Sequence, residues 1–392
     1  MSKTIITTVG TSIFTNYIYH ISHDIQEKYE RYNSIESDKI NEKAHKNDMT
    51  YLQTKIEQYL NQRGKSAAAE VQSSLLIQKE LEDHIIVNLI ASDTVSCVLA
   101  SRVLSNNKNL NCESITFMFD EKKDIIKGLQ VNDRKKFETH GLVNLIQRLN
   151  EIINEKYYTN VALNITGGYK ASVPYLTLFS QIYNIPLFYI FEDTDELIRI
   201  PHAPMSINWG VFERYSNLFQ QLDKGIYDWN KIKAQQMIDD DVRMCIWEDD
   251  ENDLAELNAI GKMYWNIYDT HFQVAIPKMS RYFNENIDKK KILEKSLQEL
   301  YNRLKLCEEH ITTLRDDILK HNKIEDSWIY KANKSHQIRI QYKYTNGCME
   351  MINYRFIQSD RDDQNYVEEM QREYQNLNKS ERTYIVLPKK IQ

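Results

Sequence analysis

The stretch Asn164-Ile165-Thr166-Gly167-Gly168-Tyr169-Lys170-Ala171-Ser172 places two adjacent glycines between an apolar segment and an amphipathic one. A buried strand is predicted at residues 161–165, and a helix is predicted from Lys170 to about residue 185. Glycine allows a backbone to turn this close to a bound group without steric cost. A helix N-terminus favours an anion, and Lys170 adds positive charge there. The stretch indicates either a phosphate or sugar-phosphate site or a plain strand-to-helix connection.

Strands alternate with helices around this stretch. Strands are predicted at residues 3–9, 85–90, 114–119 and 187–191, with amphipathic helical patterns between them. This alternation is typical of an α/β domain with a parallel sheet and helices on both faces. The length of 392 residues suggests roughly two or three domains. We therefore predict domain boundaries that give an N-terminal domain at 1–205, a linker at 206–268 and a C-terminal domain at 269–392.

Three polar turns follow predicted strands of the N-terminal sheet. Residues 10–12 (Gly-Thr-Ser) follow the first strand, residues 92–94 (Ser-Asp-Thr) follow the second, and residues 166–168 follow the strand of the opening stretch. Ligands of such sheets bind at the carboxyl ends of the strands. Residues 92–94 also suit helix N-capping, which is compatible with ligand binding. We expect the three turns to form one binding edge.

Composition excludes several classes of function. The formal net charge of −6 argues against a surface coated in positive charge for bulk nucleic-acid binding. The five cysteines are scattered without a Cys-x-x-Cys pair, which is typical of reduced cytosolic thiols and offers no zinc site. No apolar run is long enough to span a membrane, and Met1 leads directly into a strand, so no signal peptide is expected. The sequence predicts a cytoplasmic protein without a metal or other cofactor.

Three segments carry a resemblance to a known family: residues 8–12 (Thr-Val-Gly-Thr-Ser), 127–130 (Lys-Gly-Leu-Gln) and 164–170. Together they resemble the CARF domain, the Rossmann-like sensor of type III CRISPR systems, over roughly the first 205 residues. The resemblance implies a homodimer that binds cyclic oligoadenylate, with cyclic tetra-adenylate favoured, across its two-fold axis. It also implies a pocket lined by Gly10, Thr11, Ser12, Ser92, Asp93, Thr94, Thr166, Gly167, Gly168 and Lys170.

The middle of the chain changes in composition after Pro201 and Pro204. Residues 217–263 are expected to be largely helical, and carboxylates are dense from Asp239 to Glu256 around a short apolar insert at residues 244–247. A helix, a short strand and a helix would make a small winged-helix-like linker. Because its acidic face would repel DNA, we expect a solvated connector.

The C-terminal region begins with a strand and a helical seam. The strand is predicted at residues 272–276, and apolar residues from Leu293 to Ile318 recur at spacings of four and three. The seam indicates either a coiled-coil-like dimer helix or two helices packed on a sheet, since no glycine or proline marks a break.

A hairpin follows the seam. Residues 337–344 alternate apolar with polar side chains, Asn346-Gly347 is a strong hairpin signal, and residues 349–356 return. Residues 328–349 contain no acidic side chain but several cations, and Arg355 follows. A basic, tyrosine-containing sheet face fits RNA, whose phosphates need cations and whose bases stack on aromatic rings. The alternative is the solvated outer face of a hairpin.

The order of strand, helices and basic hairpin resembles the RelE-type toxins, over residues 271–374. These are small metal-independent ribonucleases of α+β fold that cut messenger RNA on the ribosome. In that chemistry the RNA 2′-OH attacks the adjacent phosphate, cations stabilise the developing charge, and a tyrosine or basic side chain handles the proton. The lysine spacing and the tail 375–392, with a strand expected at 383–387, depart from the family pattern. By position, the resemblance implies catalytic roles for Lys331, Lys334, Arg339, Arg361 and Tyr366.

The leading hypothesis is a ribonuclease activated by cyclic oligoadenylate in CRISPR antiviral defence, acting on RNA and in particular on ribosome-bound mRNA. One alternative is a HEPN ribonuclease, since Arg303 to His310 and Arg315 to His321 fit the Arg-x4–6-His pattern. HEPN domains are all-helical, however, and the predicted hairpin contradicts that fold. A second alternative is a CARF transcriptional regulator, which would need a basic recognition helix that the acidic middle does not offer.

Overall fold

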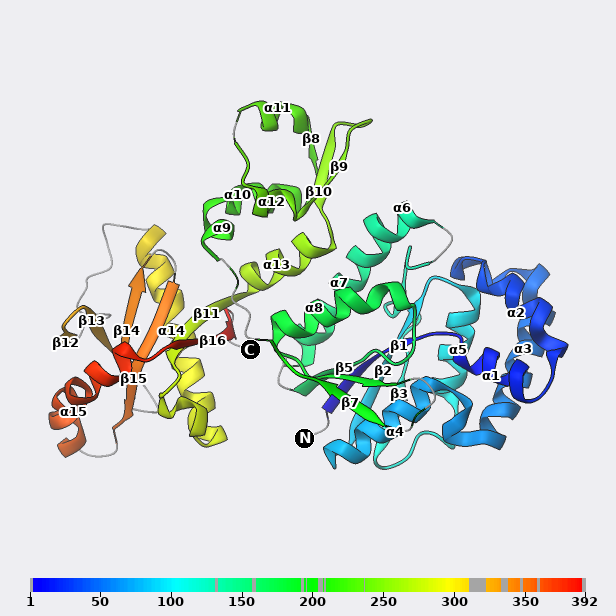
Figure 1. Cartoon of the computed structure of the whole chain (residues 1–392), viewed down its shortest axis with the longest axis horizontal. Coiled ribbons are helices and arrows are strands. Elements are labelled where there is room, and N and C mark those ends of the chain that lie inside the picture. The colour runs from blue at the N-terminus through cyan, green and yellow to red at the C-terminus, as the bar shows by residue number, and fades with distance from the viewer. Residues whose placement is uncertain are drawn as a thin grey trace. The chain divides into compact units, whose positions relative to one another are not determined.

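The computed structural model describes residues 3–130, 133–156, 160–191, 194, 196–203, 207, 209–235, 237–309, 322–332, 338–345, 348–357 and 360–389. The chain divides into two compact units. One comprises residues 1–205 with 221–263, and the other comprises residues 206–220 with 264–392. The predicted linker at 206–268 therefore contributes to both. Figure 1 shows the chain with its elements labelled.

A mixed sheet forms the centre of the N-terminal unit. In the described residues its order is β3-β2-β1-β5-β6-β7, with β4 paired to β2. Strand β1 runs parallel to both β2 and β5, as the sequence predicted, whereas β7 is an additional strand antiparallel to β6. The central strands are apolar because they are covered: Ile5 and Val87 are 0% exposed. The strands are β1 (Lys3–Val9), β2 (Ile85–Ser92), β3 (Ile115–Met118), β4 (Ile125–Ile126), β5 (Val161–Asn164), β6 (Leu187–Ile190) and β7 (Leu197–Ile200).

The helices of this unit pack against that sheet and against one another (Figure 1). They are α1 (Ser12–His20), α2 (Gln26–Asn33), α3 (Lys46–Arg63), α4 (Ala69–Leu81), α5 (Val95–Asn106), α6 (Arg134–Lys136), α7 (Leu142–Lys156) and α8 (Val173–Tyr183). A π-helical turn at Phe137–Gly141 lies between α6 and α7. A Cβ atom on Gly141 would lie 2.5 Å from the carbonyl oxygen of Gly128. The π-helical turn thus coincides with a glycine contact between the helix and the loop at 127–130.

The acidic middle of the chain contains more strand than predicted. Its elements are α9 (Trp209–Arg214), α10 (Ser216–Leu222), β8 (Ile226–Tyr227), α11 (Trp229–Gln235), α12 (Asp240–Arg243), β9 (Ile246–Asp249), β10 (Leu254–Leu257) and α13 (Ala259–Thr270). The strands form an antiparallel sheet of order β8-β10-β9. The expectation of a largely helical segment with one strand was therefore wrong, because residues 246–257 form a strand pair instead of continuing as helix.

A six-stranded sheet of order β12-β13-β14-β15-β11-β16 forms the centre of the C-terminal unit. Strand β11 is parallel to β15, and the other neighbours are antiparallel. The strands predicted at 272–276 and 383–387 and both strands of the predicted hairpin are confirmed, while Asn346 and Gly347 lie outside the described residues. The elements are β11 (His271–Pro277), α14 (Ile287–Glu309), β12 (Asn322–Ile324), β13 (Ser327–Ala332), β14 (Ile338–Thr345), β15 (Cys348–Phe356), α15 (Asp360–Lys379) and β16 (Arg382–Pro388).

Helices cover both faces of the hairpin. Leu293 and Leu297 of α14 pack in one apolar cluster with Ile340 and Tyr342, and Met370 of α15 packs with residues of the opposite face. The described part of the helical seam therefore packs on a sheet, and the seam beyond Glu309 lies outside the described residues. In its described residues the hairpin is neither an open RNA platform nor a solvated outer face, because the side chains on both faces are buried or half-buried.

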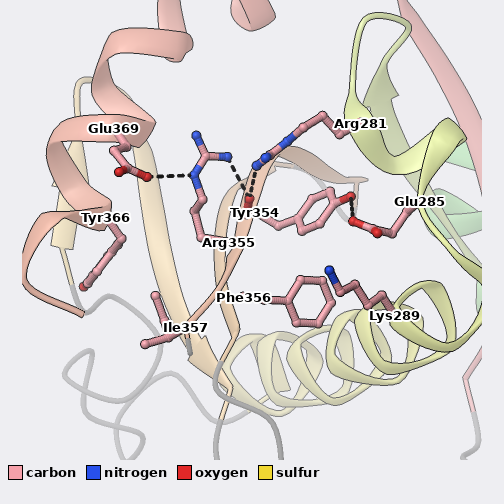
Figure 2. Close-up of a pocket in the computed structure, with 9 residues that line it drawn as sticks. All are labelled: Arg281, Glu285, Lys289, Tyr354, Arg355, Phe356, Ile357, Tyr366 and Glu369. Atoms are coloured by element: carbon pink, nitrogen blue, oxygen red, sulfur yellow. Dashed lines mark hydrogen bonds and ion pairs between the residues drawn. The ribbon is translucent and has the colours of Figure 1, made fainter. Parts of the chain in front are cut away.

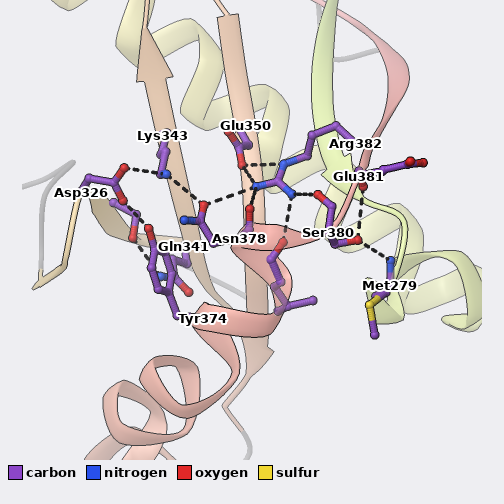
Figure 3. Close-up of polar contacts among 12 residues, drawn as sticks. Met279, Asp326, Gln341, Lys343, Glu350, Tyr374, Asn378, Ser380, Glu381 and Arg382 are labelled. Carbon is purple, nitrogen blue, oxygen red and sulfur yellow. Dashed lines mark hydrogen bonds and ion pairs between the residues drawn. The ribbon is translucent and has the colours of Figure 1, made fainter.

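Arg382 ties β16 to the end of α15 (Figure 3). Its Nε donates to Glu350 of β15 over 2.7 Å, and its Nη1 donates to the Leu377 carbonyl over 2.9 Å. A second Nη1 bond goes to the carbonyl of Ser380. The guanidinium thus satisfies carbonyl groups that the end of a helix leaves without intrahelical partners.

In the described part of the chain, no helix is both long and apolar enough to cross a bilayer.

Candidate functional site

The glycine turns after β1 and β5 lie against each other. A Cβ atom on Gly10 would lie 2.9 Å from the amide nitrogen of Gly168, and one on Gly168 would lie 2.6 Å from Cβ of Thr8. Gly168 also has a φ of +91°, which side-chain-bearing residues rarely adopt. The Thr8 hydroxyl donates to the Gly167 carbonyl over 2.7 Å. Two of the three predicted turns are therefore brought together at a separation that requires glycine.

A buried carboxylate joins these turns to α4. Glu70 is 1% exposed, and its Oε1 accepts a hydrogen bond of 2.7 Å from the Gly10 amide. Its Oε2 accepts another of 2.7 Å from the Ser12 hydroxyl. In this structure both donors are thus bonded to Glu70. No local pattern in the sequence marks Glu70, because it occupies an ordinary position of a helix and contacts Gly10 only through the fold.

A second buried carboxylate, Asp93, organises the turn after β2. It is 2% exposed and accepts hydrogen bonds from the Ser37 hydroxyl (2.5 Å), Lys127 Nζ (3.2 Å) and the Gly128 amide (2.9 Å). Burial alone would raise the pKa of Asp93, but these donors and the Lys127 charge outweigh it, so the pKa is lowered. The structure thus brings together the turn at 92–94 and the segment at 127–130, both of which the sequence analysis had selected.

The other members of the 92–94 turn face inward. The Thr94 hydroxyl accepts a bond of 3.3 Å from the Cys97 amide and so caps α5, which confirms the predicted capping role. The Ser92 hydroxyl lies 2.9 Å from Cys97 Sγ, and both Ser92 and Thr94 are buried.

The turns after β1 and β5 are more open. The Thr11 hydroxyl lies 2.9 Å from the Tyr29 hydroxyl, and the Thr166 hydroxyl donates to Asn164 over 2.8 Å. Both threonines are half-buried, and Lys170 is exposed. Of the predicted binding edge, the part formed by residues 10–12 and 166–170 is therefore the part with exposed surface.

A cavity of about 280 Å³ lies in the C-terminal unit (Figure 2). In the described residues β11 pairs with β15 only at Met349 and Glu350, so the later part of β15 pairs with β14 on one edge, while its residues 354–356 line the cavity. Side chains from a short helix at Arg281–Asn284, α14, β15 and α15 surround it. The lining residues are Arg281, Glu285, Lys289, Tyr354, Arg355, Phe356, Ile357, Tyr366 and Glu369.

Tyr354 makes polar contacts with three other residues that line this cavity (Figure 2). Its carbonyl accepts from Arg281 over 3.1 Å and from Arg355 over 3.2 Å, and its hydroxyl donates to Glu285 over 2.9 Å. Burial, together with the Glu285 carboxylate, raises the pKa of Tyr354. The phenol therefore remains protonated at neutral pH and acts as a donor.

The predicted catalytic residues Arg339 and Tyr366 lie one above the other. The Arg339 guanidinium carbon is 5.3 Å from the centre of the Tyr366 ring. Strand pairing sets Lys331, Arg339 and Arg355 opposite one another on β13, β14 and β15, which makes a cationic row on one face of the sheet. Arg339 is 0% exposed, so in this conformation it supports Tyr366 and does not reach a surface where RNA could bind.

The other predicted catalytic residues are Lys331, Lys334 and Arg361. Lys331 is half-buried on β13, whereas Lys334 and the side chain of Arg361 lie outside the described residues. Sequence reasoning missed Arg281 and Lys289 because they lie far upstream of the hairpin and no spacing pattern links them to it. Among the described residues, no group of three or more His, Cys, Asp and Glu side chains is placed to hold a metal ion.

Comparison with known proteins supports a relationship for part of the N-terminal unit. Residues 63–203 match the family model described as CRISPR-associated protein (Cas_APE2256). No curated protein matches the chain. Among solved structures, the chain is similar to Can2 from Sulfobacillus thermosulfidooxidans in complex with cyclic tetra-adenylate (cA4), with 13% identity and a TM-score of 0.18, over 68% of this chain and 69% of that one. That TM-score is too low to support an inference, so the finding that matters is the likeness of residues 63–203 to CRISPR-associated proteins.

Proposed function

We propose that this protein is a ribonuclease of CRISPR antiviral defence that is activated by cyclic oligoadenylate. The observation that carries the proposal is the combination of two sites in one chain. Residues 63–203, which match a CRISPR-associated family, contain two of the three turns of the binding edge. The other unit contains a cavity with Arg281, Lys289 and Arg355 in its lining.

The binding edge suits a phosphate-containing ligand. Its glycines allow the turns after β1 and β5 to pack closely together, and the exposed Lys170 supplies positive charge beside them. Lys127, whose side chain is 57% exposed, adds a second cation beside Asp93. A ring with two-fold symmetry, with cyclic tetra-adenylate favoured, would be bound by a homodimer whose two protomers each present this edge.

The C-terminal unit supports a RelE-like effector. A strand, a long helix, a hairpin and a helix that carries Tyr366 follow one another in the order on which the resemblance rests. An all-helical HEPN domain does not fit the six-stranded sheet. The regulator alternative has no support from a basic surface in the middle of the chain, where β9 and the residues after it are rich in carboxylates.

The proposed reaction is transesterification within RNA. The 2′-hydroxyl gives up its proton as its oxygen forms a bond to the adjacent phosphorus. The bond from phosphorus to the 5′-oxygen breaks as that oxygen takes up a proton, which leaves a 2′,3′-cyclic phosphate and a 5′-hydroxyl. Arg281, Lys289 and Arg355 would stabilise the charge that develops on the phosphate. Tyr354, held protonated, would donate a hydrogen bond, and Tyr366 lines the same cavity.

Two roles follow for the residues that were predicted from the resemblance. Arg339 would position Tyr366 and would not touch substrate, because it is fully buried beneath that ring. Lys331, Lys334 and Arg361 remain candidates for contact with RNA or for proton transfer. Ribosome-bound mRNA is the proposed substrate. For activation, cyclic oligoadenylate must bind the active arrangement of the protein more tightly than the inactive one, since equal affinity would not shift the equilibrium between them.

Titration calorimetry with cyclic tetra-adenylate and cyclic hexa-adenylate tests the sensor half. We expect tight binding of the tetra-adenylate, with a loss of at least about tenfold for Lys170→Ala, since charge-assisted contacts are worth about 1.5–3 kcal/mol. Lys108→Ala is the matched control, because Lys108 is an exposed lysine that follows the C-terminal end of α5, away from the carboxyl ends of the strands. Absence of binding of either ring would refute the sensor.

A further inference from the structure

Arg355 is held by more than its own strand. Its side chain is only 12% exposed, and all three of its guanidinium nitrogens have partners. Nη1 donates to the carbonyl of Tyr354 (3.2 Å) and to Oδ1 of Asn353 (3.4 Å). Nη2 donates to Glu373 over 2.6 Å, and Nε donates to Glu369 over 3.3 Å. This cation of the cavity lining is therefore neutralised by two carboxylates of α15.

The two carboxylates differ in how firmly they are held. Glu373 also accepts a bond of 3.0 Å from the amide of Asn353, so it is tied to the strand at two points. Glu369 lies at 3.3 Å, the longer of the two contacts, its side chain is 54% exposed, and it lines the cavity, which Glu373 does not. Glu369 can therefore turn into solvent at small cost, while Glu373 keeps Arg355 in place.

We propose that the Glu369 carboxylate occupies the position of a substrate phosphate, and that RNA must displace it from Arg355. The inference rests on the proposed ribonuclease function and adds a built-in competitor to it. A carboxylate and a phosphodiester each present anionic oxygens to the fork of an arginine, so the same guanidinium can exchange one for the other. Glu369 would therefore lower the affinity of the protein for RNA that fills only part of the cavity.

The test compares glutamates that are neighbours in sequence. Glu369→Gln removes the competing charge with little change of shape. Glu368→Gln removes the same charge one residue away, where the side chain is 76% exposed and contacts Arg372 at 3.6 Å. Fluorescence anisotropy of a short 2′-O-methylated single-stranded RNA, which cannot undergo 2′-OH attack, measures affinity for the full-length protein with cyclic tetra-adenylate present.

We expect Glu369→Gln to bind the RNA about two- to fivefold more tightly than wild type, the range expected from an exposed ion pair. The slope of log affinity against log salt should steepen by up to about 0.7, because loss of the Glu369 charge leaves Nε of Arg355 available to a phosphate of single-stranded RNA, while Glu373 keeps its own contact. Glu368→Gln should match wild type.

Equal affinity and salt slope for the two glutamine variants would overturn the inference. Arg355→Gln separates this outcome from failure of the function. If Arg355→Gln weakens RNA binding while Glu369→Gln changes nothing, the cavity binds RNA but Glu369 is no competitor. If Arg355→Gln has no effect either, the cavity is not the phosphate site, and both the inference and the proposed effector site are overturned.

Discussion

Gly168→Ala should strongly destabilise the N-terminal sheet. The added Cβ would lie 2.6 Å from Cβ of Thr8 and 2.7 Å from its hydroxyl oxygen, closer than real Cβ contacts. The φ of +91° adds backbone strain. Strain of this kind costs about 1–3 kcal/mol, and overpacking of a tight site costs about 1–3 kcal/mol more. We expect a total loss of about 2–6 kcal/mol.

Gly64→Ala is the matched control for this change. Gly64 also has a positive φ, of +55°, but no atom lies within 4 Å of where its Cβ would be. It therefore incurs the backbone strain without the steric overlap. The difference between the two variants isolates the overlap with Thr8, at about 1–3 kcal/mol.

Hydrogen exchange with mass spectrometry suits this measurement, because all five tryptophans lie outside residues 1–205 and tryptophan fluorescence would not report on the sheet. Peptides from β2 should exchange about five- to 150-fold faster in Gly168→Ala than in Gly64→Ala, the factor that corresponds to 1–3 kcal/mol. Peptides from β14 in the other unit should be unchanged. Equal exchange of β2 in the two variants would refute the close contact between the turns.

Two further predictions concern stability. The pKa of Asp93 is lowered in the folded state, so its contribution to stability is fully present above its unfolded pKa of about 3.9 and is lost as pH falls through the folded value. In acid unfolding curves, Asp93→Asn should therefore be less stable than wild type at neutral pH. This difference in stability should disappear at low pH. Arg382→Ala should lower the stability of the C-terminal unit by about 2–4 kcal/mol, because it leaves Glu350 and several carbonyls without their donor. The control Arg372→Ala, at an ion pair whose side chains are about 76–77% exposed, should lower it by under about 0.5 kcal/mol. Urea unfolding followed by hydrogen exchange of β15 measures both.

Local patterns predicted most of the strands because each carries its own apolar signature. The strand at 3–9 was predicted from a β-branched run, the strands at 85–90 and 161–165 were predicted as short buried strands, and the three were found as β1, β2 and β5. The hairpin was predicted from strict alternation, and both strands are present. The short strand β8 escaped prediction because its pairing partner β10 is distant in sequence, and β10 escaped it because the residues after the insert at 244–247 were expected to form a helix.

The sites were less predictable because they depend on long-range contacts. Polar turns at strand ends could be recognised, but Glu70 reaches Gly10 across 60 positions of sequence. Arg339 has the residue type of a catalytic cation, and only the fold shows that α15 covers it. Alternation is typical of a sheet with one solvated face, so the burial of Arg339 against an aromatic ring could not be inferred from the pattern of residues 337–344.

The most direct test of the proposed function is protein synthesis in a cell-free translation extract, with and without cyclic tetra-adenylate. Wild type, Lys170→Ala, Arg355→Ala and the exposed control Arg372→Ala would be compared, with cut messenger RNA mapped by primer extension. We predict that the ligand arrests translation and produces cuts in mRNA for wild type and Arg372→Ala, and that both effects disappear in Lys170→Ala and Arg355→Ala. Translation that continues in wild type with the ligand present, or cleavage that is undiminished in Arg355→Ala, would contradict the account.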